Sequence, residues 1–279
     1  MYTIEIGPLS LSLHKTVRVA TNIEGAANLP PSLGNFEIFK VSDFPNSPKH
    51  WDKEGCFIAM HSKEAMWIIF QTCVPVAVMV GAGKINALDG KSFGEKLEKD
   101  NYLVTPPQPW LDGWKGDDGS VYQFVATEVG ENKTIGEQLR ETKDHAILLS
   151  VFEAKNPEKF KTQRFCEEGY ESSVECCSMM QFAAGSSNLT CEMGLGKGGK
   201  ITQKIYEDPY GIEEWKECAT KTVKIYLINA SEFSEVTGRP LPPSPITEES
   251  YDGIWFGLED QTLKDIQGTK IFDKLKDVV

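Results

Sequence analysis

The chain has 279 residues, of which 40% are hydrophobic and 25% are charged, a composition typical of a soluble globular protein and not of a disordered one. The formal net charge of −12 disfavours nucleic acid and anionic membrane surfaces as partners, because their phosphates would be repelled. The N-terminal residues 1–20 alternate in polarity without a basic leader or a long apolar run, so no signal peptide is expected. No transmembrane helix is expected either, since no window approaches about 18 consecutive apolar residues. We expect a cytoplasmic location or an internal, vacuole-like compartment.

Short segments rich in β-branched and aromatic residues recur along the chain, and Gly- and Pro-rich turns separate them. This pattern predicts a mostly β protein with a β-sandwich or jelly-roll-like core, organised as a single large β-rich domain over residues 1–279. The predicted strands, in chain order, are residues 2–7, 16–21, 36–41, 65–71, 76–81, 84–88, 120–127, 146–152, 200–206 and 222–229.

Helical signals are few. Two capping-box patterns, Ser92 with Glu95 and Thr134 with Glu137, each predict a short helix. The C-terminal segment is also predicted to be helical, because its apolar residues recur at helical spacing: Leu263, Ile266, Phe272 and Leu275. Residues 154–190 are the least regular part and are predicted to form a Cys-rich excursion.

Residues Gly194 to Lys200 read G-x-x-x-x-G-K, which is nearly the pattern of a phosphate-binding loop. Such a loop needs Ser or Thr after the lysine and a helix after that, but Ile201 follows Lys200 and the next residues alternate with a period of two. The sequence therefore predicts a glycine-rich bend between two strands, with the second strand over 200–206.

Residues 108–124 combine tryptophans, acids and turn residues. The acids Asp112, Asp117 and Asp118 could suggest a calcium loop, but Trp114 and Gly116 fall where such a loop requires oxygen ligands. Residues 115–120 are therefore predicted to be a hairpin turn. Trp67 is expected in the core, whereas Trp110 and Trp114 lie beside prolines and a turn and are expected to be more exposed. Trp110, Asp112 and Trp114 are therefore the candidate residues for binding a glycan or another small ligand.

Seven cysteines leave at least one thiol unpaired within the chain. Four of them fall within a polar segment and are candidates for intermolecular disulfides: Cys166, Cys176, Cys177 and Cys191. Cys56 and His61 are close in sequence and could form a catalytic pair, although spacing alone does not place them together. No cofactor and no metal site are predicted.

Several blocks of the sequence, among them PPQPWLDGW, VYQFVATEVG and MGLGKGGKITQKIYEDPYG, resemble successive blocks of a poorly characterised protein family of bacteria and fungi. The likeness covers nearly the whole chain except residues 154–190. The pattern is also similar to octin, a fungal protein that assembles into dense octahedral crystals in vacuoles. This resemblance implies self-association, dense packing and cysteine cross-links, and it brings no catalytic residues.

The leading hypothesis is thus a non-enzymatic, self-associating structural protein that could form ordered or crystalline inclusions, with itself as partner. The first alternative is a β-sandwich binding module for a glycan or small ligand. The second is an enzyme that uses Cys56 and His61.

Overall fold

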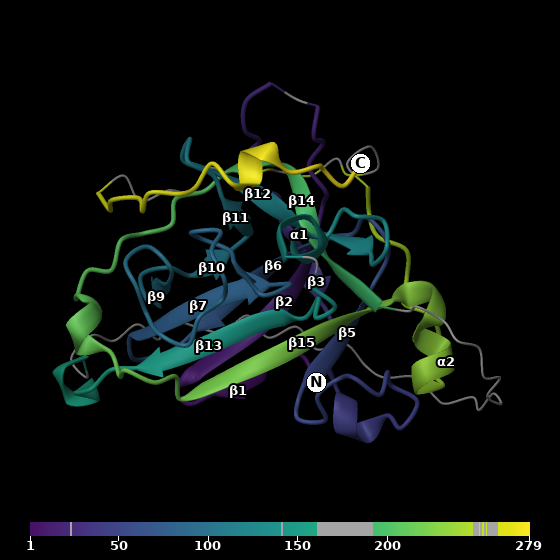
Figure 1. The fold of residues 1–279 in the computed structure, drawn as a ribbon, viewed down its shortest axis with the longest axis horizontal. Helices are drawn as coiled ribbons and strands as arrows, with labels where there is room; N and C mark the ends of the chain where they lie inside the picture. The colour runs from purple at the N-terminus through teal and green to yellow at the C-terminus, as the bar shows by residue number, and fades with distance from the viewer. Residues whose placement is uncertain are drawn as a thin grey trace.

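A computed structural model describes residues 1–22, 24–140, 142–160, 192–247, 251, 253, 255 and 262–279 (Figure 1). Its strands belong to one 15-stranded sheet, which is antiparallel except where β5 pairs with β15. The strands are β1 Ile4–Ile6, β2 Leu9–Thr16, β3 Ser32–Asn35, β4 Phe39–Lys40, β5 Cys56–Met60, β6 Ala65–Gln71, β7 Val76–Ala82, β8 Ile85–Asn86, β9 Leu103–Thr105, β10 Trp110–Leu111, β11 Gly113–Lys115, β12 Ser120–Glu128, β13 Ile147–Glu153, β14 Glu192–Thr202 and β15 Lys221–Asn229.

The sheet folds back on itself around one hydrophobic cluster, which we call the main core. The path of hydrogen-bonded strands runs β1-β2-β6-β12-β14-β15-β13-β7-β8. Alternate residues from both halves of this path enter the main core: Leu9, Leu11 and Leu13 of β2, Met66, Ile68 and Phe70 of β6, Val76, Val78 and Val80 of β7, and Ile147, Leu149 and Val151 of β13. Because successive side chains of a strand point to opposite faces, this alternation assigns the remaining residues of β2 and β6 to the outer face.

The mostly β class predicted from the sequence is confirmed. The predicted segment 65–71 coincides with β6, and 76–81, 120–127, 146–152 and 222–229 agree with β7, β12, β13 and β15 to within one residue at each end. The hairpin turn predicted at 115–120 is also present, between β11 and β12. These segments carry their own signal because each combines a buried face with β-branched or aromatic side chains.

The prediction of a glycine-rich bend is wrong, because residues 192–202 form the continuous strand β14. Glycine suits this strand since other backbone segments approach it closely. A Cβ on Gly199 would lie 2.5 Å from the carbonyl oxygen of Ala20, and one on Gly196 would lie 2.8 Å from that of Lys133. Pairing ends at Thr202, so the strand expected over 200–206 is mostly absent.

The strand predictions for the first 21 residues were also wrong in part. The segment 9–16 forms β2, one of the longer strands, whereas the strand predicted over 16–21 does not form. After Thr16 the backbone is bound by a side chain instead of a neighbouring strand: the Gln123 amide donates to the carbonyl oxygen of Val17 and accepts from the N–H of Val19.

Of the predicted helices, one is confirmed. Helix α1, Ile135–Arg140, begins after Thr134, whose hydroxyl accepts from the N–H of Glu137 while the Glu137 carboxylate accepts from the N–H of Thr134. The other helical elements in the described ranges are α2 (Phe233–Thr237) and the 3-10 turns η1 Val41–Asp43, η2 Pro157–Phe160, η3 Ile212–Glu214, η4 Ala230–Glu232 and η6 Phe272–Lys274.

The helix predicted from Ser92 and Glu95 is wrong. The segment is held in an irregular conformation by β8 and its neighbours: Ser92 forms a bridge with Ile85, and the N–H of Phe93 donates to the carbonyl oxygen of Lys84. These backbone bonds replace the local hydrogen bonds that a helix would need.

The C-terminal segment 262–279 contains a single 3-10 turn, Phe272–Lys274, in place of longer helical pieces. In Figure 1 this segment is yellow and passes beside β12 and β14. It is extended because it bonds to other backbone segments: the N–H of Ile266 donates to the carbonyl oxygen of Ile205, and the N–H of Val278 to that of Lys197. None of the described helices has the length and apolar character needed to cross a lipid bilayer.

Candidate functional site

A cavity of about 210 Å³ lies on the outer face of the sheet, over β6 and β10. We call it the outer-face cavity; its lining residues are Leu29, Pro30, Pro31, Ser32, Trp67, Trp110 and Asp112. Trp67 reaches it because its neighbours Met66 and Ile68 enter the main core, so the indole between them is on the opposite face.

The two tryptophans meet edge to face. Trp67 and Trp110 have ring centroids 5.9 Å apart and an interplanar angle of 89°. The pairing of β10 with β6 sets Trp110 opposite Ile69, two residues from Trp67 on the same face of β6. Aromatic side chains at such diagonal positions are within reach of each other across a sheet. The sheet register therefore brings together two rings that are far apart in the sequence.

The proline wall of the outer-face cavity is held against β2 by hydrogen bonds. The Thr16 hydroxyl donates to the carbonyl oxygen of Pro31 over 2.8 Å. His14 bridges two serines, with 2.7 Å from its Nδ1 to Ser32 Oγ and 2.8 Å from its Nε2 to Ser12 Oγ. Burial lowers the pKa of His14 to about 4, so this imidazole is neutral at physiological pH. It acts as part of the wall and adds no charge.

Asp112 is the one titratable residue among the seven that line the outer-face cavity. Only 1% of its surface is exposed, and its Oδ2 has no hydrogen-bond partner among the described residues. Burial raises the pKa of Asp112 to about 7, and a hydrogen bond from the Trp110 side chain opposes that rise only in part. The carboxyl group is thus poised to change charge near neutral pH.

The backbone around Asp112 is fixed from three directions. Its N–H donates to Gln203 Oε1 over 3.1 Å, and its carbonyl oxygen accepts from the N–H of Phe124 over 2.9 Å. The amides of Gln108 and Gln203 both donate to the carbonyl oxygen of Trp110. These bonds hold the backbone of Asp112, and the Trp110 side chain provides the hydrogen bond to its carboxyl group.

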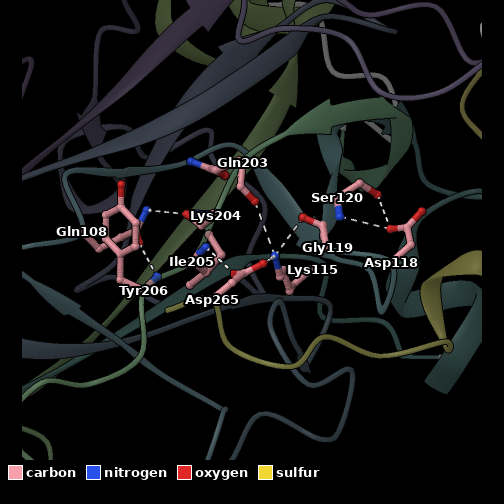
Figure 2. A network of polar contacts seen from close by, with 10 residues as sticks. All are labelled: Gln108, Lys115, Asp118, Gly119, Ser120, Gln203, Lys204, Ile205, Tyr206 and Asp265. Atoms are coloured by element: carbon pink, nitrogen blue, oxygen red, sulfur yellow. Dashed lines mark hydrogen bonds and ion pairs between the residues drawn. The ribbon is translucent and has the colours of Figure 1, made fainter. Parts of the chain in front are cut away.

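Figure 2 shows a polar network that includes Gln108 and Gln203, whose side chains bind this backbone. At its centre the fully buried Lys115 donates to the carbonyl oxygens of Gly119 and Gln203 and to the carboxylate of Asp265. Asp265 in turn accepts from the N–H of Ile205, and Gln108 accepts from the N–H of Tyr206. The network locks the irregular segment 203–206 against the residues that lead into the site.

A second polar atom beside the outer-face cavity is also unpaired. The indole Nε1 of Trp67 is buried and has no acceptor among the described residues. An unpaired buried donor or acceptor costs about 1–3 kcal/mol, so two such groups in one place call for an explanation. A ligand that both donates and accepts a hydrogen bond, or ordered water, would satisfy them.

The structure unites part of the predicted ligand site. Trp110 and Asp112 lie together as expected, but Trp114 does not: it is fully buried in the main core, packs against Phe124 and Phe272, and donates to the carbonyl oxygen of Gly196. The regular strand is interrupted at Asp112, between β10 and β11, which lets these side chains enter opposite sides of the sheet. Trp67 was expected in the core and instead completes the site; the alternation of 65–71 was the signal that could have found it.

A larger cavity, of about 600 Å³, runs along the glycine-rich strand β14. Two of the three lysines that line it are paired with aspartates: Lys197 Nζ lies 3.0 Å from Asp277 Oδ1, and Lys200 Nζ lies 2.5 Å from Asp118 Oδ2. A phosphate bound to these two lysines would have to displace the carboxylates. No helix follows β14, so the arrangement differs from a phosphate-binding loop.

A third cavity, of about 580 Å³, contains His50, Glu192 and His145. His50 Nε2 lies 2.9 Å from Glu192 Oε2, and burial lowers the pKa of His145. Within the part of the chain that is described, no group of three or more His, Cys, Asp or Glu residues is placed to hold a metal ion.

Cys56 and His61 do not form a pair. Cys56 begins β5 and is buried, whereas His61 follows the other end of the strand and contacts the carbonyl oxygens of Pro242 and Pro243. Five residue steps along extended chain place their Cα atoms roughly 16 Å apart. The four candidate disulfide cysteines, Cys166, Cys176, Cys177 and Cys191, lie outside the described residues.

No protein-family model matches the chain, and no match was found among the curated proteins or the solved structures.

Proposed function

We propose that the protein is a binding module for a small molecule that occupies the outer-face cavity. The observation that carries this proposal is the coincidence of Asp112 Oδ2 and Trp67 Nε1, two buried and unpaired polar atoms on residues that line one cavity. Pockets for small molecules combine apolar and aromatic walls with a few fixed polar groups. At about 210 Å³ the cavity is smaller than typical drug-sized sites of about 300–1,000 Å³, so it suits a small metabolite.

The contacts favour binding over catalysis. Ser32 and His14 resemble a nucleophile with its base, since Ser32 Oγ lies 2.7 Å from His14 Nδ1. An imidazole whose pKa is about 4 is a weak general base at neutral pH, however, and its other nitrogen is bonded to the Ser12 hydroxyl instead of a carboxylate. The pair is better suited to holding the proline wall in place.

A ligand screen read out by thermal shift, with intrinsic tryptophan fluorescence as a second readout, tests the proposal. Hits at the outer-face cavity should be weakened by Asp112→Leu and by Trp67→Phe. The matched control is Trp51→Phe, because the Trp51 indole nitrogen is also buried and unpaired but belongs to a separate hydrophobic cluster. Hits that lose affinity equally in the Trp51 variant, or in none of the variants, would contradict a site at this cavity.

The self-association hypothesis stays a prediction, and it is compatible with ligand binding. Its proposed links are the four cysteines outside the described residues. Among the described cysteines, Cys218 is free and exposed, which makes it the natural control for any cross-linking experiment.

A further inference from the structure

We infer that the ligand of the outer-face cavity is a small organic cation, a methylated ammonium of about the size of choline, which sits against the two indole rings and pairs with the carboxylate of Asp112. This inference rests on the proposed binding function and names the chemical class of its ligand.

The first argument is charge. Burial and the Trp110 hydrogen bond are the causes that shift the pKa of Asp112, and no cationic side chain is among them. Two buried lysines among the described residues are paired with carboxylates, Lys115 with Asp265 and Lys197 with Asp277. A buried carboxylate without a cation is expensive, and a ligand cation would supply the missing partner.

The second argument is the aromatic surface. A cation within about 6 Å of an indole centroid is attracted by the ring quadrupole, and the attraction grows when water is excluded. Trp67 and Trp110 line the same cavity at right angles to each other, so they offer two differently oriented aromatic surfaces to one ligand. Methyl groups on the cation would also contact the apolar wall that Leu29, Pro30 and Pro31 form.

The third argument disfavours a glycan, the ligand class first expected for Trp110 and Asp112. A monosaccharide carries several hydroxyl groups, each of which needs a partner once it is buried. The cavity offers Asp112 Oδ2 and Trp67 Nε1, while the Ser32 hydroxyl is already bonded to His14. A sugar would leave most of its hydroxyls unsatisfied, whereas the single hydroxyl of a choline-like ligand accepts from Trp67 Nε1 and its ammonium charge offsets the Asp112 carboxylate without a hydrogen bond.

The cation should bind the charged form of Asp112, so its affinity should depend on pH. Among the described residues, the groups bonded to Asp112 are neutral: the Gln203 side chain, the N–H of Phe124 and the Trp110 indole. His14, which contacts Trp67 from β2, is uncharged above its pKa of about 4. Asp112 is then the group that titrates. Because its pKa is about 7, affinity should fall roughly tenfold for each pH unit below that value and level off above it.

The test is isothermal titration of the full chain at about pH 8 with choline, with tetramethylammonium, and with 3,3-dimethylbutan-1-ol, which has the shape of choline without its charge. We expect both cations to bind at least tenfold more tightly than the alcohol. Asp112→Asn, which keeps the shape and removes the charge, should cost at least tenfold in cation affinity. Trp51→Phe should leave it unchanged.

Other outcomes would overturn the inference in distinguishable ways. Equal binding of choline and the alcohol, or cation binding that does not change between about pH 8 and pH 5.5, would show that charge is not recognised, while the proposed binding function would stand. Tight binding of glucose that Asp112→Asn abolishes would return the site to carbohydrates. If no cation binds at millimolar concentration, the ligand class is wrong, and the neutral members of the broader screen then decide whether the cavity binds anything.

Discussion

Lys115 Nζ lies 2.6 Å from Asp265 Oδ2, and this contact joins the hairpin of β11 and β12 to the C-terminal segment. The lysine side chain is completely buried, whereas 24% of the aspartate side chain remains exposed. The same ammonium group donates to the carbonyl oxygen of Gln203, whose side chain binds the backbone of Asp112. The ion pair is therefore connected to the candidate site through Gln203.

Removing the Asp265 charge should destabilise the fold. Asp265→Asn leaves a buried ammonium group without its counter-ion, a change that typically costs about 3–5 kcal/mol. Urea unfolding should show the loss, and the double variant Lys115→Met with Asp265→Asn should recover part of it because no buried charge remains. The control is Glu214→Gln, which breaks an exposed pair with Lys159 and should cost less than about 1 kcal/mol. An Asp265 variant as stable as the parent would show that the backbone carbonyls alone satisfy Lys115.

Asp112 should make the protein less stable as pH rises. Burial raises its pKa from 3.8 to about 7, so below about pH 4 the group is neutral in both the folded and the unfolded chain. Between about pH 4 and 7 the unfolded chain loses the proton first, and the free energy of unfolding falls. Above about pH 7 the penalty is constant, at up to about 4 kcal/mol.

Asp112→Asn removes this titration. The variant should be more stable than the parent at about pH 8 and nearly equal to it at about pH 4, as measured by urea midpoints at both values. A difference between variant and parent that is the same at the two pH values would contradict the raised pKa. Asp112 lowers the stability of the ligand-free protein, and a role in binding the ligand would explain why the chain has a carboxyl group at this position.

Gly199 tests why β14 is rich in glycine. An alanine there would place its Cβ 2.5 Å from the carbonyl oxygen of Ala20 and 2.7 Å from that of Val19, both backbone atoms. Gly199→Ala should therefore push segment 19–20 away from the strand and destabilise the protein by about 1–3 kcal/mol. The control is Gly94→Ala, where the nearest atom is 4.0 Å away. Equal melting temperatures for the two variants would contradict the explanation that close packing requires glycine at position 199.

The sequence predicted those strands whose evidence is local. Residues 65–71 and 76–82 carry a buried face and β-branched or aromatic side chains, so composition and alternation were enough. β14 was missed because its glycines have a low strand propensity, and the reason for them lies in segments distant in sequence, such as residues 19–20 and 133. Tertiary contacts override propensity there.

The sequence predicted only part of the candidate site, again because the rest depends on tertiary structure. The cluster of Trp110, Asp112 and Trp114 indicated a binding region, but sequence spacing could not show that the strand breaks at Asp112 and sends Trp114 into the main core. The alternation of residues 65–71 was enough to place the third member, Trp67, on the outer face, but its contact with Trp110 depends on the pairing of β10 with β6, which no local pattern specifies. Nor could the sequence show that no cationic side chain among the described residues contributes to the pKa shift of Asp112.

Intermolecular disulfides, if they link copies of the chain, should make its assembly depend on redox conditions. Such bonds form only where the surroundings are oxidising. Light scattering at high protein concentration should give a larger mass without reductant than with it. Replacing Cys166, Cys176, Cys177 and Cys191 by serine should abolish the difference, whereas Cys218→Ser, at an exposed free thiol, should preserve it. If Cys218→Ser alone removes the effect, the links have been assigned to the wrong cysteines. A monomer whose mass does not change with reductant would reject cysteine-linked assembly altogether.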